Sequence, residues 1–118
     1  MEWTLIFFLL FPSVGKVICQ DDAIPPKITS IFKNEYHLPV STVLADTKIT
    51  CKARHGQIQY EWRKDNITVQ SSEFVSVNNS TGTLSFNKMR NSDYGTYQCL
   101  ASNNAGTSIS NPFEVKKT

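Results

Sequence analysis

Histidine is scarce in this sequence of 118 residues, which contains only His37 and His55. His55 has no second histidine or cysteine at metal-ligand spacing, so no zinc-type ligand set is present. The sequence also lacks a glycine-rich phosphate loop, a serine nucleophile elbow and a conspicuous carboxylate pair. These absences predict a protein that is not an enzyme and that uses no metal or cofactor.

A strong net charge is missing as well. Twelve basic and ten acidic residues give a formal charge of +2, and no basic run is longer than the pair Lys116-Lys117. Nucleic-acid binders rely on a basic surface that neutralises phosphates, so we expect no nucleic-acid partner. With 40% hydrophobic and 19% charged residues, the composition is that of a globular protein, and the length suits one domain with a short extra segment.

The sequence has a single long apolar run, Leu5–Phe11. A membrane-spanning helix needs about 18 or more apolar residues, so this run is too short for an anchor. Its length and the small residues that follow it indicate a secretory signal peptide, although no basic residue precedes it. Cleavage after Gly15 or after Cys19 fits, and we prefer Cys19. Residues 1–19 are then the signal peptide and residues 20–25 a leader, the mature chain is extracellular, and nothing in it inserts into a membrane.

Cysteine is rare too, with three residues in the chain. Cysteines of secreted proteins normally form disulfides. Removal of Cys19 with the signal peptide leaves Cys51 and Cys99. The mature chain is therefore predicted to hold one disulfide and no free thiol.

From Pro25 onward, short stretches alternate between apolar and polar residues and are separated by Gly, Asn, Asp and Pro. This pattern is typical of β-strands joined by turns. About seven strands imply an all-β fold of two packed antiparallel sheets. The predicted strands are Lys27–Phe32, Thr47–Ala53, Ile58–Lys64, Phe74–Val77, Thr83–Phe86, Gly95–Ser102 and Thr107–Val115.

Three residues have the spacing of an immunoglobulin-type sandwich. Cys51 and Cys99 are 48 positions apart, and Trp62 follows the first cysteine by eleven residues. In that fold the disulfide joins the two sheets, and the tryptophan packs against it from the third strand. The sequence thus predicts an immunoglobulin-like domain over residues 26–117 with one inter-sheet disulfide.

The residues before the second cysteine support the same fold. Tyr97 lies two residues before Cys99, at the position of a tyrosine corner, whose hydroxyl bonds to the backbone upstream. Gly95 permits a backbone angle that a side chain would obstruct, and Asp93 can accept hydrogen bonds from nearby amides. The predicted fourth strand, Phe74–Val77, offers no basic residue that could pair with Asp93.

Two segments extend this likeness to a known family. The stretches Pro25–Thr29 and Gln98–Asn111 resemble the first immunoglobulin domain, of the intermediate set, in the neural adhesion family that includes neuroglian and neurofascin. The resemblance implies a cell-adhesion module, involved in processes such as axon guidance, that binds other immunoglobulin domains homophilically or heterophilically at the cell surface. The chain would then be a fragment of a longer receptor. The alternatives are a secreted one-domain recognition protein, such as a hemolin-like immune factor or a decoy, and a non-adhesive ligand.

Two further sets of residues are candidates for modification and contact. N-glycosylation sequons begin at Asn66, Asn78 and Asn79, although a chain rich in Asn, Ser and Thr also contains sequons by chance. We favour Asn66 because it lies in a predicted exposed turn. Strand alternation also predicts an outward sheet face on which Leu100 is an exposed apolar anchor among polar neighbours, unless it is simply an ordinary exposed leucine. Those neighbours are Gln98, Glu61 and Arg63.

Overall fold

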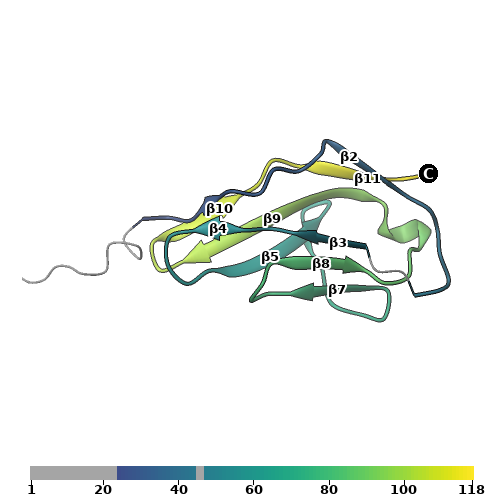
Figure 1. The fold of residues 1–118 in the computed structure, drawn as a ribbon, viewed down its shortest axis with the longest axis horizontal. Helices are drawn as coiled ribbons and strands as arrows, with labels where there is room; N and C mark the ends of the chain where they lie inside the picture. Colours follow the sequence, from purple (N-terminus) through teal and green to yellow (C-terminus); the bar gives the residue numbers. More distant parts are fainter. Residues whose placement is uncertain (1–23, 45–46) are drawn as a thin grey trace, which may run out of the picture.

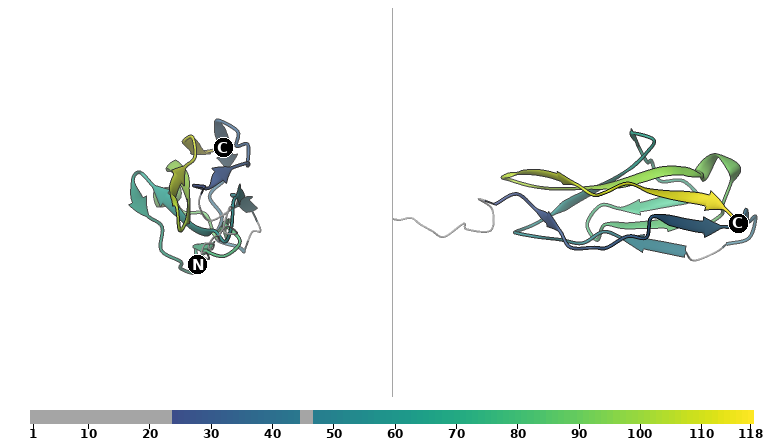
Figure 2. Two further views of the ribbon diagram at one scale, coloured as in Figure 1. Left: turned by 90° about the vertical axis from the view of Figure 1, so that its left-hand side faces the viewer. Right: turned by 90° about the horizontal axis from the view of Figure 1, so that it is seen from above.

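A computed structural model describes residues 24–44 and 47–118 of the chain. The predicted signal peptide, both cleavage positions and residues 20–23 of the leader lie outside the described residues. Within the described part the protein consists of β-strands and a single short 3-10 turn, η4 (Asn91–Asp93). The strands form two facing layers, as Figures 1 and 2 show.

The larger layer is a six-stranded sheet in the order β2-β11-β9-β5-β6, with β10 also paired to β9. The second layer is the three-stranded sheet β3-β8-β7, extended by the pair β1-β4. The strands of the larger layer are β2 (Glu35–Leu38), β5 (Gln59–Lys64), β6 (Ile67–Thr68), β9 (Gly95–Asn103), β10 (Gly106–Ile109) and β11 (Phe113–Lys117). Those of the second layer are β1 (Lys27–Ile28), β3 (Thr47–Thr50), β4 (Ala53–Arg54), β7 (Val75–Asn78) and β8 (Thr83–Phe86).

The predicted all-β sandwich is confirmed, but the first strand differs from the prediction. A single strand over Lys27–Phe32 is wrong: β1 pairs with β4 for two residues, and the chain then crosses to the other layer. There β2 pairs with β11 in parallel, at the opposite end of the sequence. The N-terminal segment thus supplies one edge strand to each layer: β1 to the second layer and β2 to the larger one. The strand β2 lies beside the C-terminal strand β11 (Figure 1).

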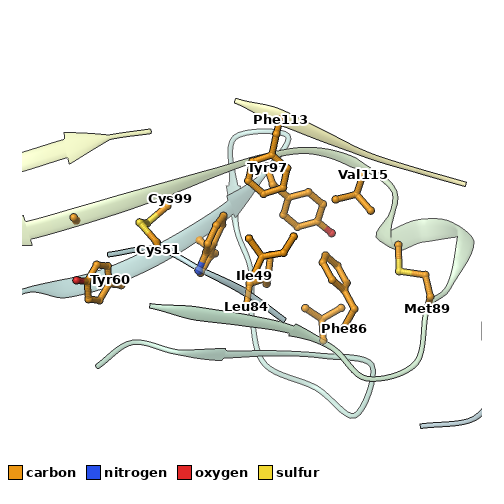
Figure 3. Packing of buried hydrophobic residues seen from close by; sticks show 13 residues of the cluster. Ile49, Cys51, Tyr60, Leu84, Phe86, Met89, Tyr97, Cys99, Phe113 and Val115 are labelled. Atoms are coloured by element: carbon orange, nitrogen blue, oxygen red, sulfur yellow. A yellow bond between two sulfur atoms is a disulfide. The ribbon is translucent and has the colours of Figure 1, made fainter. Parts of the chain in front are cut away.

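Buried side chains from both layers meet in the centre, as Figure 3 shows. On β5 the alternation turns Tyr60 and Trp62 inward, and Trp62 lies opposite Cys99 of β9. The core consists of Ile49, Cys51, Tyr60, Trp62, Val75, Leu84, Phe86, Met89, Tyr97, Cys99, Ala101, Phe113 and Val115.

The predicted disulfide between Cys51 and Cys99 is confirmed. Both cysteines are fully buried, and their Cα atoms lie 6.4 Å apart, so the bond links the two layers through the core. In the chain-entropy model, closing a loop of this length stabilises the fold by roughly 4 kcal/mol.

Trp62 is the largest fully buried side chain. Its ring makes edge contacts with Phe32 and Phe113, each at a centroid distance of 5.9 Å. Its indole nitrogen donates a hydrogen bond to the carbonyl of Gly82 at 3.0 Å. Gly82 has a φ of +77°, and an added Cβ would lie 2.3 Å from the carbonyl oxygen of Cys51, so only glycine fits there.

The turn between β8 and β9 is fixed by a compact set of contacts. The Tyr97 hydroxyl donates to the Asp93 carbonyl at 2.5 Å, and burial raises the pKa of this phenol above its ordinary value. The buried Asp93 carboxylate accepts hydrogen bonds from the Arg90 amide at 2.9 Å and from its guanidinium at 2.9 and 3.1 Å. The Arg90 guanidinium also lies 3.9 Å from the ring centre of Phe74. The basic partner of Asp93 therefore comes from its own turn, three residues upstream, while the neighbouring strand region supplies an aromatic ring.

Candidate functional site

The outward side of β6, β5, β9 and β10 gathers the side chains that sequence reasoning selected for contact. Because Tyr60 and Trp62 point inward, Glu61 and Arg63 point outward on β5. We call this surface the front face; it consists of Gln59, Glu61, Arg63, Thr68, Gln98, Leu100, Ser102, Thr107 and Ile109.

A hydrogen-bonded cluster lies on the β5–β6 side of the front face. The Glu61 oxygen Oε2 accepts hydrogen bonds from the Thr68 hydroxyl at 2.5 Å and from the Arg63 Nε at 3.0 Å. The hydrogen bond from Thr68, followed by that from Arg63, lowers the pKa of the Glu61 carboxyl, so this group is charged at neutral pH. The cluster holds one acidic and one basic side chain in a fixed arrangement two residues apart.

Both ends of this ion pair keep bonding capacity. No further hydrogen bond is formed by Glu61 Oε1 or by the terminal amino groups of Arg63 with the described residues. The two side chains are 36% and 39% exposed. The pair therefore presents a carboxylate acceptor and guanidinium donors to a partner.

The prediction that Leu100 is an exposed anchor is wrong, since it is only 5% exposed. Leu100 does lie on the outer side of β9 and is not part of the central core cluster. It is flanked by Glu61 on β5 and by Ile109 on β10, because both strands pair with β9 at this position. A central strand with neighbours on both sides leaves little of a medium-sized side chain exposed.

The accessible apolar side chain of the front face is instead Ile109, which is 57% exposed. It lies opposite Leu100, so the two side chains form an apolar pair within a polar surface. Sequence analysis did not single out Ile109. The register of β10 on β9 would have identified it, and that register depends on the turn at Asn103–Gly106.

Gln98 lies on the front face, as the strand alternation predicts, but its side-chain amide is already engaged within the domain. Its side-chain amide donates to the carbonyl of Ser110 at 3.1 Å, in the short connection between β10 and β11. The Ser110 hydroxyl accepts a hydrogen bond from the Cys99 amide at 2.9 Å, so this connection is anchored to β9. The amide group of Gln98 therefore serves first to hold the sheet together.

A cluster of charged side chains lies at the other edge of the same sheet, on β11 and β2. Lys116 of β11 contacts Glu35 of β2 at 3.0 Å and Glu114 at 3.2 Å, and His37 lies 3.2 Å from Glu35. The hydrogen bond with Lys116 lowers the pKa of Glu35, and the same contact raises the pKa of Lys116. Such exposed ion pairs contribute little to stability, so we assign this group to the surface rather than to a reactive centre.

The three sequons lie at exposed positions in two turns. Asn66 follows β5 in a left-handed conformation with a φ of +69°. Thr68, the last residue of its sequon, donates the hydrogen bond to Glu61. Asn78 ends β7, and its side-chain oxygen accepts hydrogen bonds from the amides of Ser80 and Thr81 at 3.0 and 3.1 Å. Asn79 is exposed beside it. Glycosylation at Asn66, Asn78 and Asn79 stays a prediction.

The described residues contain no group of three or more His, Cys, Asp or Glu side chains arranged to hold a metal ion. Residues 24–44 and 47–118 contain no helix with the length and apolar character needed to cross a membrane. What the front face offers chemically is non-covalent contact, through one ion pair, several hydroxyl and amide groups and one exposed isoleucine.

Comparison with known proteins agrees with the geometry. The family model of the immunoglobulin domain matches residues 25–103. The membrane-bound isoform of mouse pro-neuregulin-2 is 32% identical over 99 residues, a match that spans 79% of this chain and 12% of the mouse protein.

Solved structures give the same result for the fold. The tandem Ig repeats of Dlar superpose with a TM-score of 0.67 and 26% identity, covering 79% of this chain and 48% of that one. The insect immune protein hemolin superposes with a TM-score of 0.66 over 80% of this chain and 24% of its own. At 23% identity, the likeness to hemolin concerns the fold alone.

Proposed function

The chain belongs to the immunoglobulin domain family, and from that premise we propose that it is an extracellular recognition module that binds another protein through its front face. Domains of this family act by binding, so the chain is not an enzyme. The partner is a protein, and the interaction is the non-covalent docking of surfaces.

The observation that carries this proposal is the composition of the front face. Protein interfaces combine an apolar centre with a polar rim, and charged side chains at the rim select the partner. Ile109 and the adjacent Leu100 supply the apolar part, on the β9–β10 side of the face, and the ordered pair of Glu61 and Arg63 supplies the polar selection. The opposite layer is less suited, because its outward positions are small hydroxyl and amide side chains around Lys48. They include Thr50, Ser76, Asn78, Thr83 and Ser85.

We further propose that the module is the outermost domain of a neuroglian-like neural adhesion protein at the cell surface. Support comes from the sequence segments Pro25–Thr29 and Gln98–Asn111 and from the 26% identity to the Ig repeats of Dlar, a receptor. The match to a membrane-bound isoform of pro-neuregulin-2 also supports a place at the membrane. A transcript that continues beyond Thr118 into further domains would favour this receptor, whereas a stop codon would favour the secreted alternative.

Binding to cells tests the proposal directly. Beads coated with the secreted domain should attach to cells that carry the partner, and neural cells are the first choice. Arg63→Glu should reduce attachment, because it replaces the basic member of the ion pair with a second acidic side chain. Lys48→Glu is the matched control, since it reverses one charge on the outer side of β3 in the opposite layer.

Both variants must melt near the wild-type temperature for the comparison to hold. Equal loss of attachment in both variants would mean that general charge, and not the front face, determines binding. Unchanged attachment of Arg63→Glu beads would remove this face from the interface.

A further inference from the structure

We propose that the front face binds a second copy of this chain, in a two-fold symmetric contact that pairs Glu61 of each copy with Arg63 of the other. This inference rests on the proposed function of the face and names its partner. The observation behind it is that one strand presents both halves of an ion pair, each with unused bonding capacity.

A two-fold contact requires a surface that is complementary to itself, because both copies use the same surface. Each contact between two different residues therefore occurs twice, once in each direction. Glu61 and Arg63 fulfil this condition: they have opposite charges, lie two residues apart on one strand and point to the same side. A two-fold axis that lies within the interface and crosses β5 between them places each Glu61 over the partner's Arg63. The free Oε1 of Glu61 in one copy can then accept a hydrogen bond from the free amino groups of Arg63 in the other copy.

The same axis also organises the apolar part of the face. Glu61, Leu100 and Ile109 form one row across three strands, because the register pairs each with the next. An axis between the rows of Glu61 and Arg63 therefore passes beside Ile109 as well. The Ile109 side chains of the two copies come together near the axis, where their exposed surface is removed from water.

A groove lined by both polar and apolar residues adjoins Ile109 at the sheet edge. Its volume is about 480 Å³, and it lies between the chain crossing after β1 and the connection between β10 and β11. Ile31, which is 97% exposed, lines it together with Ile109. Both isoleucines thus lie where the proposed contact reaches the edge of the front face.

The contact is expected to be weak in solution. A stable interface buries about 1,200 Å² or more, and a single face of a small domain seldom reaches this area. Exposed ion pairs add little affinity but fix the orientation of a partner, since misplaced like charges repel. Weak, well-oriented contacts of this kind become effective when many copies act together on two surfaces.

Charge reversal gives a test that separates this contact from association driven by general charge. Sedimentation velocity of the secreted chain, followed up to millimolar concentration, should show a monomer–dimer equilibrium. Glu61→Arg and Arg63→Glu should each weaken dimerisation at least about tenfold, because each places like charges opposite one another twice. Lys48→Glu is the matched control and should dimerise like the wild type.

The decisive sample is an equimolar mixture of the two single variants. The Glu61→Arg variant carries arginine at both positions of the pair, and the Arg63→Glu variant carries glutamate at both. In the symmetric contact the two arginines of one variant face the two glutamates of the other, so heterodimers should form although neither variant dimerises alone. The double variant Glu61→Arg/Arg63→Glu should also dimerise. Loss of the internal contact between Glu61 and Arg63 cannot account for the recovery in the mixture, because both single variants lack that contact.

Two results would overturn the inference: a wild-type chain that stays monomeric throughout, or a mixture that shows no heterodimer. If beads still attach to cells through the front face in that case, the partner is a different protein and the proposed function stands. If the chain dimerises as expected but beads do not attach to cells, the self-contact stands and the recognition of cells fails.

Discussion

Replacement of Trp62 by alanine tests how far the whole sandwich depends on one side chain. The substitution removes the largest fully buried side chain, two edge-on aromatic contacts and the hydrogen bond to the Gly82 carbonyl. Tryptophan-to-alanine changes in cores cost about 3–5 kcal/mol, because apolar transfer energy is lost and a cavity remains. Against a total stability of about 5–15 kcal/mol, the folded state would become marginal.

Urea unfolding followed by far-UV circular dichroism measures this cost. For a small domain with a slope of about 1 kcal/mol per molar urea, the midpoint should fall by about 3 M or more. The melting temperature should fall by roughly 12–40 °C, from about 4–8 °C per kcal/mol. Fluorescence is unsuitable, since the only other tryptophan is Trp3, within the predicted signal peptide.

Trp62→Phe is the matched control for the same site. It keeps an aromatic ring near Phe32 and Phe113 but loses the hydrogen bond from the indole nitrogen to the Gly82 carbonyl. That carbonyl still accepts a hydrogen bond from the Cys51 amide at 2.8 Å, so the loss costs about 0.5–1.5 kcal/mol. The phenylalanine variant should therefore be intermediate between the wild type and the alanine variant. A midpoint of the alanine variant within about 0.5 M of the wild type would refute the central role of this residue.

Three further predictions concern single side chains. Burial raises the pKa of Tyr97, so its contribution to stability is complete below the ordinary tyrosine pKa of about 10 and is lost as the pH rises beyond it; Tyr97→Phe should flatten this alkaline decline, which urea midpoints between about pH 9 and pH 11 would measure. Leu100→Asp should lower the melting temperature, because it places a charge at a position that is 5% exposed, and unchanged melting would mean that this position is open to solvent. N-glycosidase treatment of the protein made in insect or mammalian cells should reduce its mass, and Asn66→Gln should remove part of that change; equal masses in both tests would mean that the sequons are chance occurrences.

The fold was predictable because its signature residues stand at characteristic distances from one another along the sequence. The positions of Cys51, Trp62 and Cys99 imply a disulfide and an adjacent indole, and the structure contains both. Strand alternation likewise predicted Glu61 and Arg63 on the outer surface, and the structure buries Tyr60 and Trp62 on the other side of the same strand. A period of two residues separates the two faces of a strand, so this division needs no knowledge of the partner strands.

Features that depend on distant pairing were not predictable in the same way. The strand β2 forms because Glu35–Leu38 pairs with the C-terminal strand, about eighty residues away, and its own sequence carries no signal for that partner. The burial of Leu100 has the same origin, because it arises from β5 and β10 on either side and not from its own strand. Asp93 acquired its basic partner, Arg90, from a turn whose geometry the strand pattern does not describe.

The front face and the core share the same strands, yet alternation lets each be specified separately. On β5, Trp62 fixes the interior while Glu61 and Arg63 on either side of it determine what the surface can bind. Charge reversals at the outer positions can therefore change partner choice without removing a buried contact. Leu100 is the exception on β9, because it points to the surface and is nevertheless covered. A substitution there alters stability and recognition together, so Ile109, which is exposed, is the better position for separating the two effects.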